Sequence, residues 1–232
     1  MTKVFNSLPA LAQTRCGTVL FADLRGYTNL AEMLAPAQIV PLLREFLALL
    51  SSAAELCGGE IFHMAGDGMM AGFGFRDPSG DGSGQALDAS RTMLKSFVPV
   101  ARRWQVEFSI QTGMGVGLHF GEVALAFLGP PGRQAETLVG DTVNVAARLC
   151  GRARAGEVLL SASVVERLEK ISARGPLSNP DVWPVPFLQL PGLELRGRAE
   201  RLDIWCLPAH ERIQIPDSRK PAPFDSGVRS TL

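Results

Sequence analysis

The chain alternates between short apolar runs and longer segments in which apolar residues recur every three or four positions. Residues 17–23 form an apolar run that is rich in strand formers and ends in a carboxylate, which predicts a buried strand. Between residues 39 and 53 the apolar side chains are spaced as in an amphipathic helix, and the glycine pair at 58–59 predicts its end. Pro36 suits the first turn of this helix, whereas Pro41 predicts either a kink or a later start.

The remaining pattern predicts hairpins, three more helices and polar loops. Strands are expected at residues 60–65, 69–75, 108–118, 123–128, 158–161, 188–195 and 201–207. Helices are expected at residues 86–103, 141–154 and 162–171. Hairpins are expected to turn at residues 66–68 and near Gly121, and the strands at 188–195 and 201–207 are expected to form a closing hairpin. Irregular segments are expected at residues 77–84, 129–136 and 175–186. This order of elements predicts an α+β fold with one sheet and helices on one face.

The composition fits a soluble globular domain and excludes several function classes. Apolar residues make up 46% of the 232 residues and charged residues 20%. Because 23 basic residues balance 23 acidic ones, no basic excess exists to bind a nucleic-acid backbone or an anionic membrane. The longest apolar stretch, residues 46–57, contains three polar residues and is too short to span a bilayer, and the first fifteen residues lack a signal-peptide pattern. We therefore expect no nucleic-acid partner and no membrane insertion.

Cysteine and histidine spacing gives no sign of a metal knuckle or a disulfide framework. The cysteines are far apart and form no CxxC pair: Cys16, Cys57, Cys150 and Cys206. We expect them to be reduced thiols in a cytoplasmic protein. His119 and His210 have no second ligand at zinc spacing, and His119 is expected to be structural.

Two carboxylates form the strongest candidate site that the residues themselves indicate. Asp23 ends a predicted strand and Asp67 lies in a predicted hairpin turn, on elements that can be neighbours in a sheet. Carboxylates presented in this way suit a pair of Mg²⁺ or Mn²⁺ ions that bridge to substrate phosphates. The alternative is that Asp23 caps the following helix and Asp67 is an ordinary turn residue. The spacing alone leaves both interpretations open.

Four sequence motifs follow one another along the chain. They are Phe21-Ala-Asp-Leu-Arg-Gly-Tyr-Thr28, Gly58-Gly-Glu-Ile-Phe-His-Met-Ala-Gly-Asp-Gly-Met-Met70, Gly115-Val-Gly-Leu-His-Phe-Gly-Glu-Val123 and Val139-Gly-Asp-Thr-Val-Asn-Val-Ala-Ala-Arg-Leu149. Together they closely resemble the catalytic domain of class III adenylyl/guanylyl cyclases, from about residue 15 to residue 207. The resemblance implies a ferredoxin-like βαββαβ core sheet with covering helices and additional C-terminal strands. Residues 1–14 would precede this catalytic domain, and residues 208–232, which are rich in proline, would form a flexible tail.

The resemblance implies a homodimer whose catalytic clefts lie at the subunit interface and are each built from both chains. By motif match, Asp23 and Asp67 would hold two divalent cations, Mg²⁺ or Mn²⁺, with the backbone carbonyl of Leu24 as a further ligand. One ion would lower the pKa of the ribose 3′-hydroxyl, and the other would hold the β- and γ-phosphates. The following turn resembles the family's phosphate-binding loop, where backbone N–H groups meet an anion. Its residues are Arg25, Gly26, Tyr27 and Thr28.

Three further residues match positions that act on the ribose and the phosphates. Asn144 and Arg148 match the pair that reaches in from the partner chain to orient the ribose and stabilise charge. The alternative for Arg148 is a surface ion pair. Arg196, with Arg198 in reserve, lies where related cyclases place a lysine near the terminal phosphates, and the alternative is a pair of solvated hairpin arginines.

The positions that select the base depart from both known patterns. His63 takes the place of the adenine-reading lysine, and Thr137 that of the aspartate. Threonine can accept a bond from the adenine 6-amino group and His63 can donate to adenine N1, so the chemistry favours ATP over GTP. The alternative is that His63 only fills a strand position and that stacking or backbone groups hold the purine, with slow turnover or relaxed specificity.

We therefore expect an adenylate cyclase that makes 3′,5′-cyclic AMP and pyrophosphate from ATP. The alternatives are a guanylate or relaxed-specificity cyclase, and a degenerate module that binds nucleotide and regulates a partner. As the chain is expected to hold only the catalytic module, its regulation would come from ions, dimerisation or a separate regulatory protein.

Overall fold

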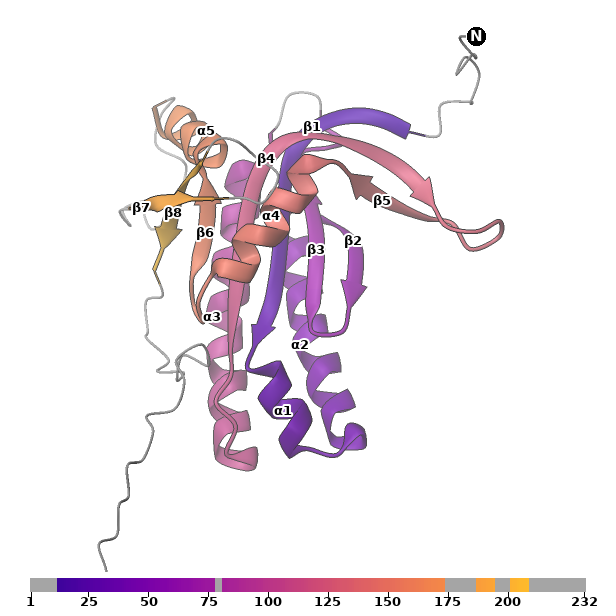
Figure 1. Ribbon diagram of the computed structural model, residues 1–232, viewed down its shortest axis with the longest axis vertical. Helices are drawn as coiled ribbons and strands as arrows, with labels where there is room; N and C mark the ends of the chain where they lie inside the picture. The colour runs from indigo at the N-terminus through magenta and orange to yellow at the C-terminus, as the bar shows by residue number, and fades with distance from the viewer. Residues whose placement is uncertain (1–11, 78–80, 174–186, 195–200, 209–232) are drawn as a thin grey trace, which may run out of the picture.

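The computed structural model describes residues 12–77, 81–173, 187–194 and 201–208, which form one sheet with helices packed against it (Figure 1). The helices are α1 (Tyr27–Met33), α2 (Pro36–Leu56), α3 (Ser83–Phe108), α4 (Asp141–Arg152) and α5 (Ala162–Ala173). The strands are β1 (Ala12–Arg25), β2 (Glu60–Ala65), β3 (Gly68–Phe73), β4 (Gly113–Leu128), β5 (Ala135–Val139), β6 (Val158–Ser161), β7 (Leu188–Leu193) and β8 (Leu202–Leu207). None of the described helices has the length and apolar character that a membrane span needs.

Strand β1 lies near the centre of the sheet. The strand order is β2-β3-β1-β4-β6-β8-β7, with β5 paired to β4. β1 pairs antiparallel with β3 on one side and with β4 on the other, while β6 runs parallel to β4. Asp23 lies opposite Gly68 in the β1–β3 ladder, so the end of β1 meets the turn between β2 and β3. The expected α+β fold with covering helices and additional C-terminal strands is confirmed.

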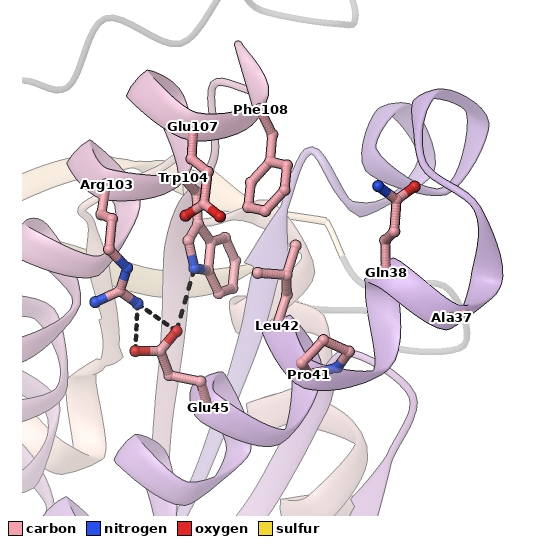
Figure 2. Close-up of a pocket in the computed structure, with 9 residues that line it drawn as sticks. All are labelled: Ala37, Gln38, Pro41, Leu42, Glu45, Arg103, Trp104, Glu107 and Phe108. Carbon is pink, nitrogen blue, oxygen red and sulfur yellow. Dashed lines mark hydrogen bonds and ion pairs between the residues drawn. The ribbon is translucent and has the colours of Figure 1, made fainter.

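Helices α2 and α3 pack side by side against one face of the sheet (Figure 1). Phe97 of α3 contacts Phe46 of α2 edge to face, with ring centroids 5.1 Å apart. Trp104 contacts Phe97 in the same way, with ring centroids 5.6 Å apart. Toward one end these helices line a pocket of about 390 Å³ (Figure 2). There Glu45 accepts hydrogen bonds from Arg103 and from Trp104 Nε1, the latter at 3.2 Å. The buried indole therefore has its polar atom satisfied.

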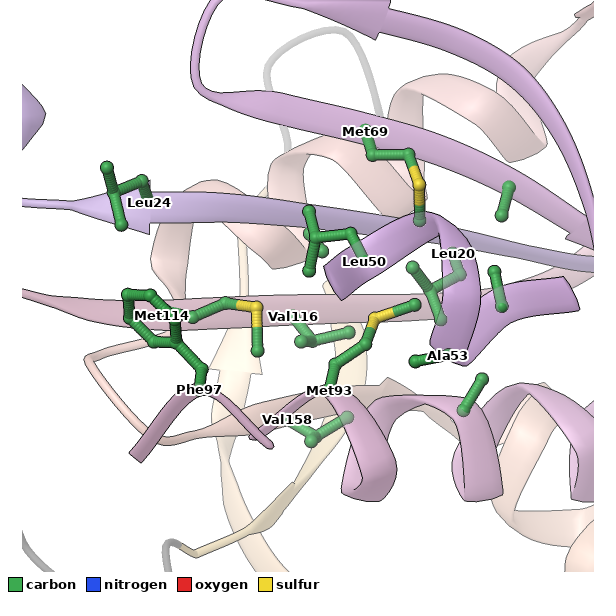
Figure 3. Packing of buried hydrophobic residues seen from close by; sticks show 14 of the residues in the cluster. Leu20, Leu24, Leu50, Ala53, Met69, Met93, Phe97, Met114, Val116 and Val158 are labelled. Carbon is green, nitrogen blue, oxygen red and sulfur yellow. The ribbon is translucent and has the colours of Figure 1, made fainter. Parts of the chain in front are cut away.

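The side chains of β1 alternate between the two faces of the sheet, as those of a strand must. Leu20 points into the main core with residues of α2 and α3 (Figure 3), whereas Val19 belongs to a second cluster that includes Ala146 of α4. α4 therefore lies on the opposite face, and the expectation that the helices share one face is wrong for α4. Gly117 explains this packing, because a Cβ there would lie 2.2 Å from the backbone nitrogen of Cys150 in α4.

Strand β4 runs without a turn for 16 residues, so the hairpin expected for residues 108–118 and 123–128 is wrong. Gly121 lies opposite Gly17 in the β1–β4 ladder. A Cβ at Gly121 would lie 2.5 Å from Thr142 Oγ1, so this glycine makes room for α4 and does not turn the chain. The strand that pairs antiparallel with β4 is β5. It begins at Ala135, inside the segment 129–136 that was expected to be irregular, and continues to Val139.

The other elements agree more closely with the pattern of the sequence. β2, β6, α5, β7 and β8 lie close to their expected positions, but β1 starts at Ala12, earlier than expected, and the short helix α1 was not expected. α2 begins at Pro36 and contains Pro41 within it. α3 continues to Phe108, because Trp104 extends its buried stripe beyond the expected end. The segment 175–186, the tail after residue 208 and both Arg196 and Arg198 lie outside the described residues.

Candidate active site

The backbone brings the two candidate carboxylates to the same end of the sheet. Asp23 is paired with Gly68, the residue after Asp67, and the Leu24 N–H donates to the Asp67 carbonyl at 2.9 Å. A Cβ at Gly68 would lie 3.1 Å from Asp23 Oδ1, so the absence of a side chain there leaves room around this carboxylate. Asp23 and Asp67 therefore form one acidic site where β1 meets the β2–β3 turn.

The electrostatics of this site fit a cation. Burial raises the pKa of the Asp23 carboxyl, the Arg25 guanidinium lowers it in part, and charge repulsion from Asp67 raises it again. The two acids are thus close enough to repel each other, and a divalent ion would relieve that repulsion. Within the described residues no third His, Cys, Asp or Glu joins them. Any such ion would therefore need main-chain oxygens, such as that of Leu24, or oxygens of a substrate.

The turn after Asp23 places a glycine in the left-handed region. Gly26 has a φ of 86° and precedes α1, and the Leu30 N–H donates to its carbonyl at 3.0 Å. Thr28 is exposed, and Tyr27 packs partly against the main core. Phosphate binding by the backbone of Arg25, Gly26, Tyr27 and Thr28 stays a prediction.

The side chain of Arg25 turns away from that loop and joins three parts of the chain. Its Nη1 donates to Asp23 Oδ2, its Nε donates to the Ala153 carbonyl at 3.0 Å, and its Nη2 donates to the Cys150 carbonyl. Nothing local in the sequence predicts this, since the two carbonyls lie 125 and 128 residues further along the chain. A sequence signal for this contact is Gly115, where the lack of a side chain leaves room for the Arg25 guanidinium.

Helix α4 presents Asn144 and Arg148 on one face. They are four residues apart and both are exposed. Neither side chain makes a hydrogen bond or an ion pair with any other residue in the described part of the chain. The surface ion pair considered for Arg148 is thus absent from these residues, and both groups are free to meet a ligand or a second chain.

The two candidate base-reading residues lie on separate strands. His63 is exposed on β2 opposite Met70, and Thr137 is half-buried on β5 opposite Ala126. No hydrogen bond joins the two side chains among the described residues, although their strands lie close together. Arg76, which sequence reasoning missed, bridges their strands, because it donates to Glu60 of β2 at 2.6 Å and to Glu136 of β5 at 2.7 Å.

The pocket between α2 and α3 is a separate feature. None of the predicted site residues lines it (Figure 2). Its lining residues are Ala37, Gln38, Pro41, Leu42, Glu45, Arg103, Trp104, Glu107 and Phe108. Elsewhere, His119 is buried and its Nδ1 lies 2.8 Å from Ser161 Oγ, in keeping with the structural role expected for it. The acidic site and α4 therefore remain the candidate catalytic surfaces.

Proteins of known sequence and structure carry the same domain. The model of the adenylate and guanylate cyclase catalytic domain matches residues 10–179. An adenylate cyclase of Anabaena cylindrica is 34% identical over 205 residues, which are 84% of this chain and 37% of the relative. Adenylate cyclase 1 of Rhizobium meliloti is 28% identical over 197 residues, which are 81% of this chain and 27% of the relative. The matched part of the chain thus spans 37% of the length of the first relative and 27% of the length of the second.

Solved structures support the same fold. The adenylyl cyclase CyaB from P. aeruginosa superposes with a TM-score of 0.75 at 24% identity, over 87% of this chain and 97% of that chain. The guanylyl cyclase Cya2 superposes with a TM-score of 0.70 at 24% identity, over 84% of this chain and 92% of that chain. Since the family model covers most of the described sheet and both candidate surfaces, the chain belongs to the adenylate and guanylate cyclase catalytic domain family.

Proposed function

We propose that this chain is the catalytic domain of an adenylate cyclase that converts ATP to 3′,5′-cyclic AMP and pyrophosphate in a cleft shared by two copies. The observation that carries the proposal is the position of Asp23 next to the turn that holds Asp67, at the end of β1, together with Asn144 and Arg148 on α4, which have no side-chain partner among the described residues. The Anabaena cylindrica relative, which bears the name adenylate cyclase, supports the choice of reaction.

The acidic site would serve the reacting end of the triphosphate. Asp23, Asp67 and the Leu24 carbonyl would hold two divalent cations, Mg²⁺ or Mn²⁺, which supply Lewis acidity and neutralise phosphate charge when bound. The ribose 3′-oxygen forms the new bond to the α-phosphorus, the bond from that phosphorus to the β-phosphate oxygen breaks, and pyrophosphate leaves with the released proton passing to solvent. The backbone N–H groups of the turn after Arg25 would bind phosphate oxygens.

The second copy would supply the groups that orient the substrate and stabilise charge. Asn144 would hold the ribose, and the Arg148 guanidinium would meet the charge that develops on the phosphates with several donors at once. Arg196 is the candidate for the terminal phosphates. In this proposal each cleft takes its acidic site from one chain and Asn144 and Arg148 from the other, so a complete cleft would form only in a homodimer.

The base-reading residues support ATP over GTP. His63 can donate to adenine N1, and Thr137 can accept from the 6-amino group. Guanine would present an N1–H and a 2-amino group, which call for an acceptor such as a carboxylate, and neither residue is acidic. A guanylate cyclase or a relaxed-specificity cyclase is the second candidate, because neither known specificity pair is complete here.

Product analysis tests the proposal. Purified protein is incubated with ATP or GTP, each with Mg²⁺ or Mn²⁺, over a range of protein concentrations, and the products are separated chromatographically. The Asp67→Asn protein, prepared in the same way, controls for a contaminating cyclase. Cyclic AMP whose specific activity rises with protein concentration supports an adenylate cyclase that works as a dimer. Cyclic GMP would reverse the base assignment, and bound nucleotide without cyclic product would favour a regulatory module.

A further inference from the structure

The side chain of Arg25 joins the acidic site to the end of α4. One guanidinium donates to the Asp23 carboxylate and to the carbonyls of Cys150 and Ala153. The Arg25 side chain is only 19% exposed, so these bonds are largely shielded from water. The bonds therefore connect two elements that the chain places far apart in sequence.

Gly115 in β4 leaves the space that the Arg25 guanidinium occupies. A Cβ at Gly115 would lie 2.4 Å from Arg25 Nη2, and its three nearest neighbours would all be atoms of the Arg25 side chain. Two residues further along, Gly117 lets α4 approach the strand closely. The glycine pair of β4 thus admits both the arginine and the helix end that it contacts.

The carbonyls that Arg25 contacts lie at the C-terminal end of α4, since Cys150 is in its last turn and Ala153 is its C-cap residue. Carbonyls at this end carry the negative end of the helix dipole, and the Cys150 carbonyl accepts from the Ala153 N–H at 3.0 Å as well as from Arg25. A cation that donates to two of them fixes the helix end from outside. An arginine can do this while it also holds Asp23, because its donors lie in one plane and point in different directions, whereas a lysine ammonium is a single point charge.

We propose that Arg25 is a positioning residue that fixes the metal-binding end of β1 relative to α4 and thereby couples the two clefts of the dimer. This inference rests on the proposed function, in which one chain gives Asp23 and Asp67 to one cleft and gives Asn144 and Arg148 to the other. The Arg25 side chain then serves both clefts through its bonds to Asp23, Cys150 and Ala153, separately from the phosphate binding proposed for the backbone of this turn.

Heterodimers with one intact cleft test this role. One chain carries Asp67→Asn and supplies only α4, and its partner carries Arg148→Ala and supplies only the acidic site. Different affinity tags allow the mixed dimer to be purified. Arg25→Gln is then added to the first chain or to the second, so that it disturbs either the α4 half or the metal half of the same cleft.

We expect Arg25→Gln to lower kcat by about ten- to a hundredfold in each placement, with KM for ATP little changed. Arg25→Lys is expected to restore less than half of the loss. A loss in one placement only, or in neither, would overturn the coupling role while leaving the shared cleft intact. A starting heterodimer that is inactive despite complete subunit exchange would overturn the shared cleft and the coupling role together.

A second measurement needs neither metal nor substrate. Hydrogen exchange of the amides at residues 149–153 is compared between the wild type, Arg25→Gln and Gly115→Ala, whose added Cβ would displace the guanidinium. Both variants should exchange faster there, by about tenfold, if Arg25 fixes the helix end. Arg103→Gln, which removes an arginine paired with Glu45 on α2, is the matched control and should leave α4 unchanged. Unchanged exchange in both test variants would contradict the proposal even if either variant had lost activity through misfolding.

Discussion

The backbone N–H of Leu24 donates to the carbonyl of Asp67 at 2.9 Å, which ties the end of β1 to the turn between β2 and β3. This bond continues the β1–β3 ladder by one step beyond the pair of Asp23 and Gly68. Asp23 and Asp67 are therefore held by main-chain bonds and not only by their own side chains. A substitution that removes one carboxylate should thus leave the geometry of the other in place.

We predict that Asp23→Asn and Asp67→Asn each lower turnover by about a thousandfold or more, because a cation site with one carboxylate loses several kcal/mol of charge stabilisation. Mn²⁺ binding, followed by electron paramagnetic resonance in the presence of a non-reactive ATP analogue, should weaken in parallel. A variant that keeps most of its rate would remove that residue from the metal site.

The melting temperature tests separately whether a loss of turnover comes from unfolding. Burial raises the pKa of Asp23, Arg25 lowers it in part and Asp67 raises it, and the pKa is raised overall. A neutral amide at this position should therefore not lower the melting temperature of the metal-free protein. Asp203→Asn removes an exposed carboxylate on β8 and serves as the matched control, with turnover and melting temperature expected to be unchanged.

His63→Lys should raise kcat/KM for ATP by about fivefold, the value of one net hydrogen bond, if His63 is a weaker substitute for the adenine-reading lysine. Turnover of GTP should not rise with it. Met64→Lys places the new charge on the next residue of β2, which faces the other side of the strand, and is expected to have no such effect. Equal kinetics for His63→Lys and the wild type would exclude His63 from the base pocket.

The acidic site was predictable because its signals are local. A run of strand-forming residues ends at Asp23, and Asp67 lies in a Gly-Asp-Gly turn. The neighbouring residues alone therefore predict where each carboxylate lies. The contacts of Arg25 were not predictable in this way, because its acceptors are main-chain carbonyls, which every residue has. Only the packing of α4 on β4 decides which carbonyls it meets.

Glycine caused the main error in the fold. In a strand pattern, a glycine such as Gly121 indicates either a turn or the close approach of another element. A turn was expected at Gly121, but the Thr142 side chain of α4 lies against this glycine. Gly121 therefore marks the close approach of α4 to the strand. Because the same ambiguity hid the position of α4, the sequence predicted the residues of that helix correctly and placed it on the wrong face.

Asp88 of α3 should make stability depend on pH. Burial raises the pKa of its carboxyl above 3.8, and Arg91 lowers it in part. At pH values between the pKa of Asp88 in the unfolded state and its higher pKa in the native state, the native state binds more protons than the unfolded state. The free energy of unfolding therefore falls as pH rises through that window. Asp88→Asn should therefore be more stable than the wild type in urea denaturation near neutral pH, and the difference should vanish below the unfolded pKa.

Cys57 offers an independent measure of the Asp88 charge. Burial raises the pKa of the Cys57 thiol, and Asp88 raises it further. Asp88→Asn should lower that pKa and speed the alkylation of Cys57 by iodoacetamide, while Cys16, which is exposed on β1, should react at an unchanged rate. A faster rate at both cysteines would indicate general loosening of the fold and would contradict the assignment to charge.

The close packing of α4 on β4 predicts a strong effect at Gly117. Its Cβ would lie 2.2 Å from the Cys150 nitrogen and 2.5 Å from the Ala146 carbonyl oxygen, and backbone atoms cannot move aside as a flexible side chain can. Gly117→Ala should therefore lower the free energy of unfolding by about 1–3 kcal/mol and displace α4. Since α4 carries Asn144 and Arg148, turnover should fall more than stability alone explains.

The matched control for this prediction lies on α4 itself. A Cβ at Gly151 would meet nothing within 4 Å, so Gly151→Ala adds the same methyl group without a clash. Because alanine favours a helix over glycine by up to about 1 kcal/mol, this variant should be as stable as the wild type or slightly more stable, with unchanged turnover. Urea denaturation and initial rates at saturating ATP measure both variants together. If Gly117→Ala behaved like Gly151→Ala, α4 would have room to move on β4, and the close contact that fixes the catalytic face of the helix would be wrong.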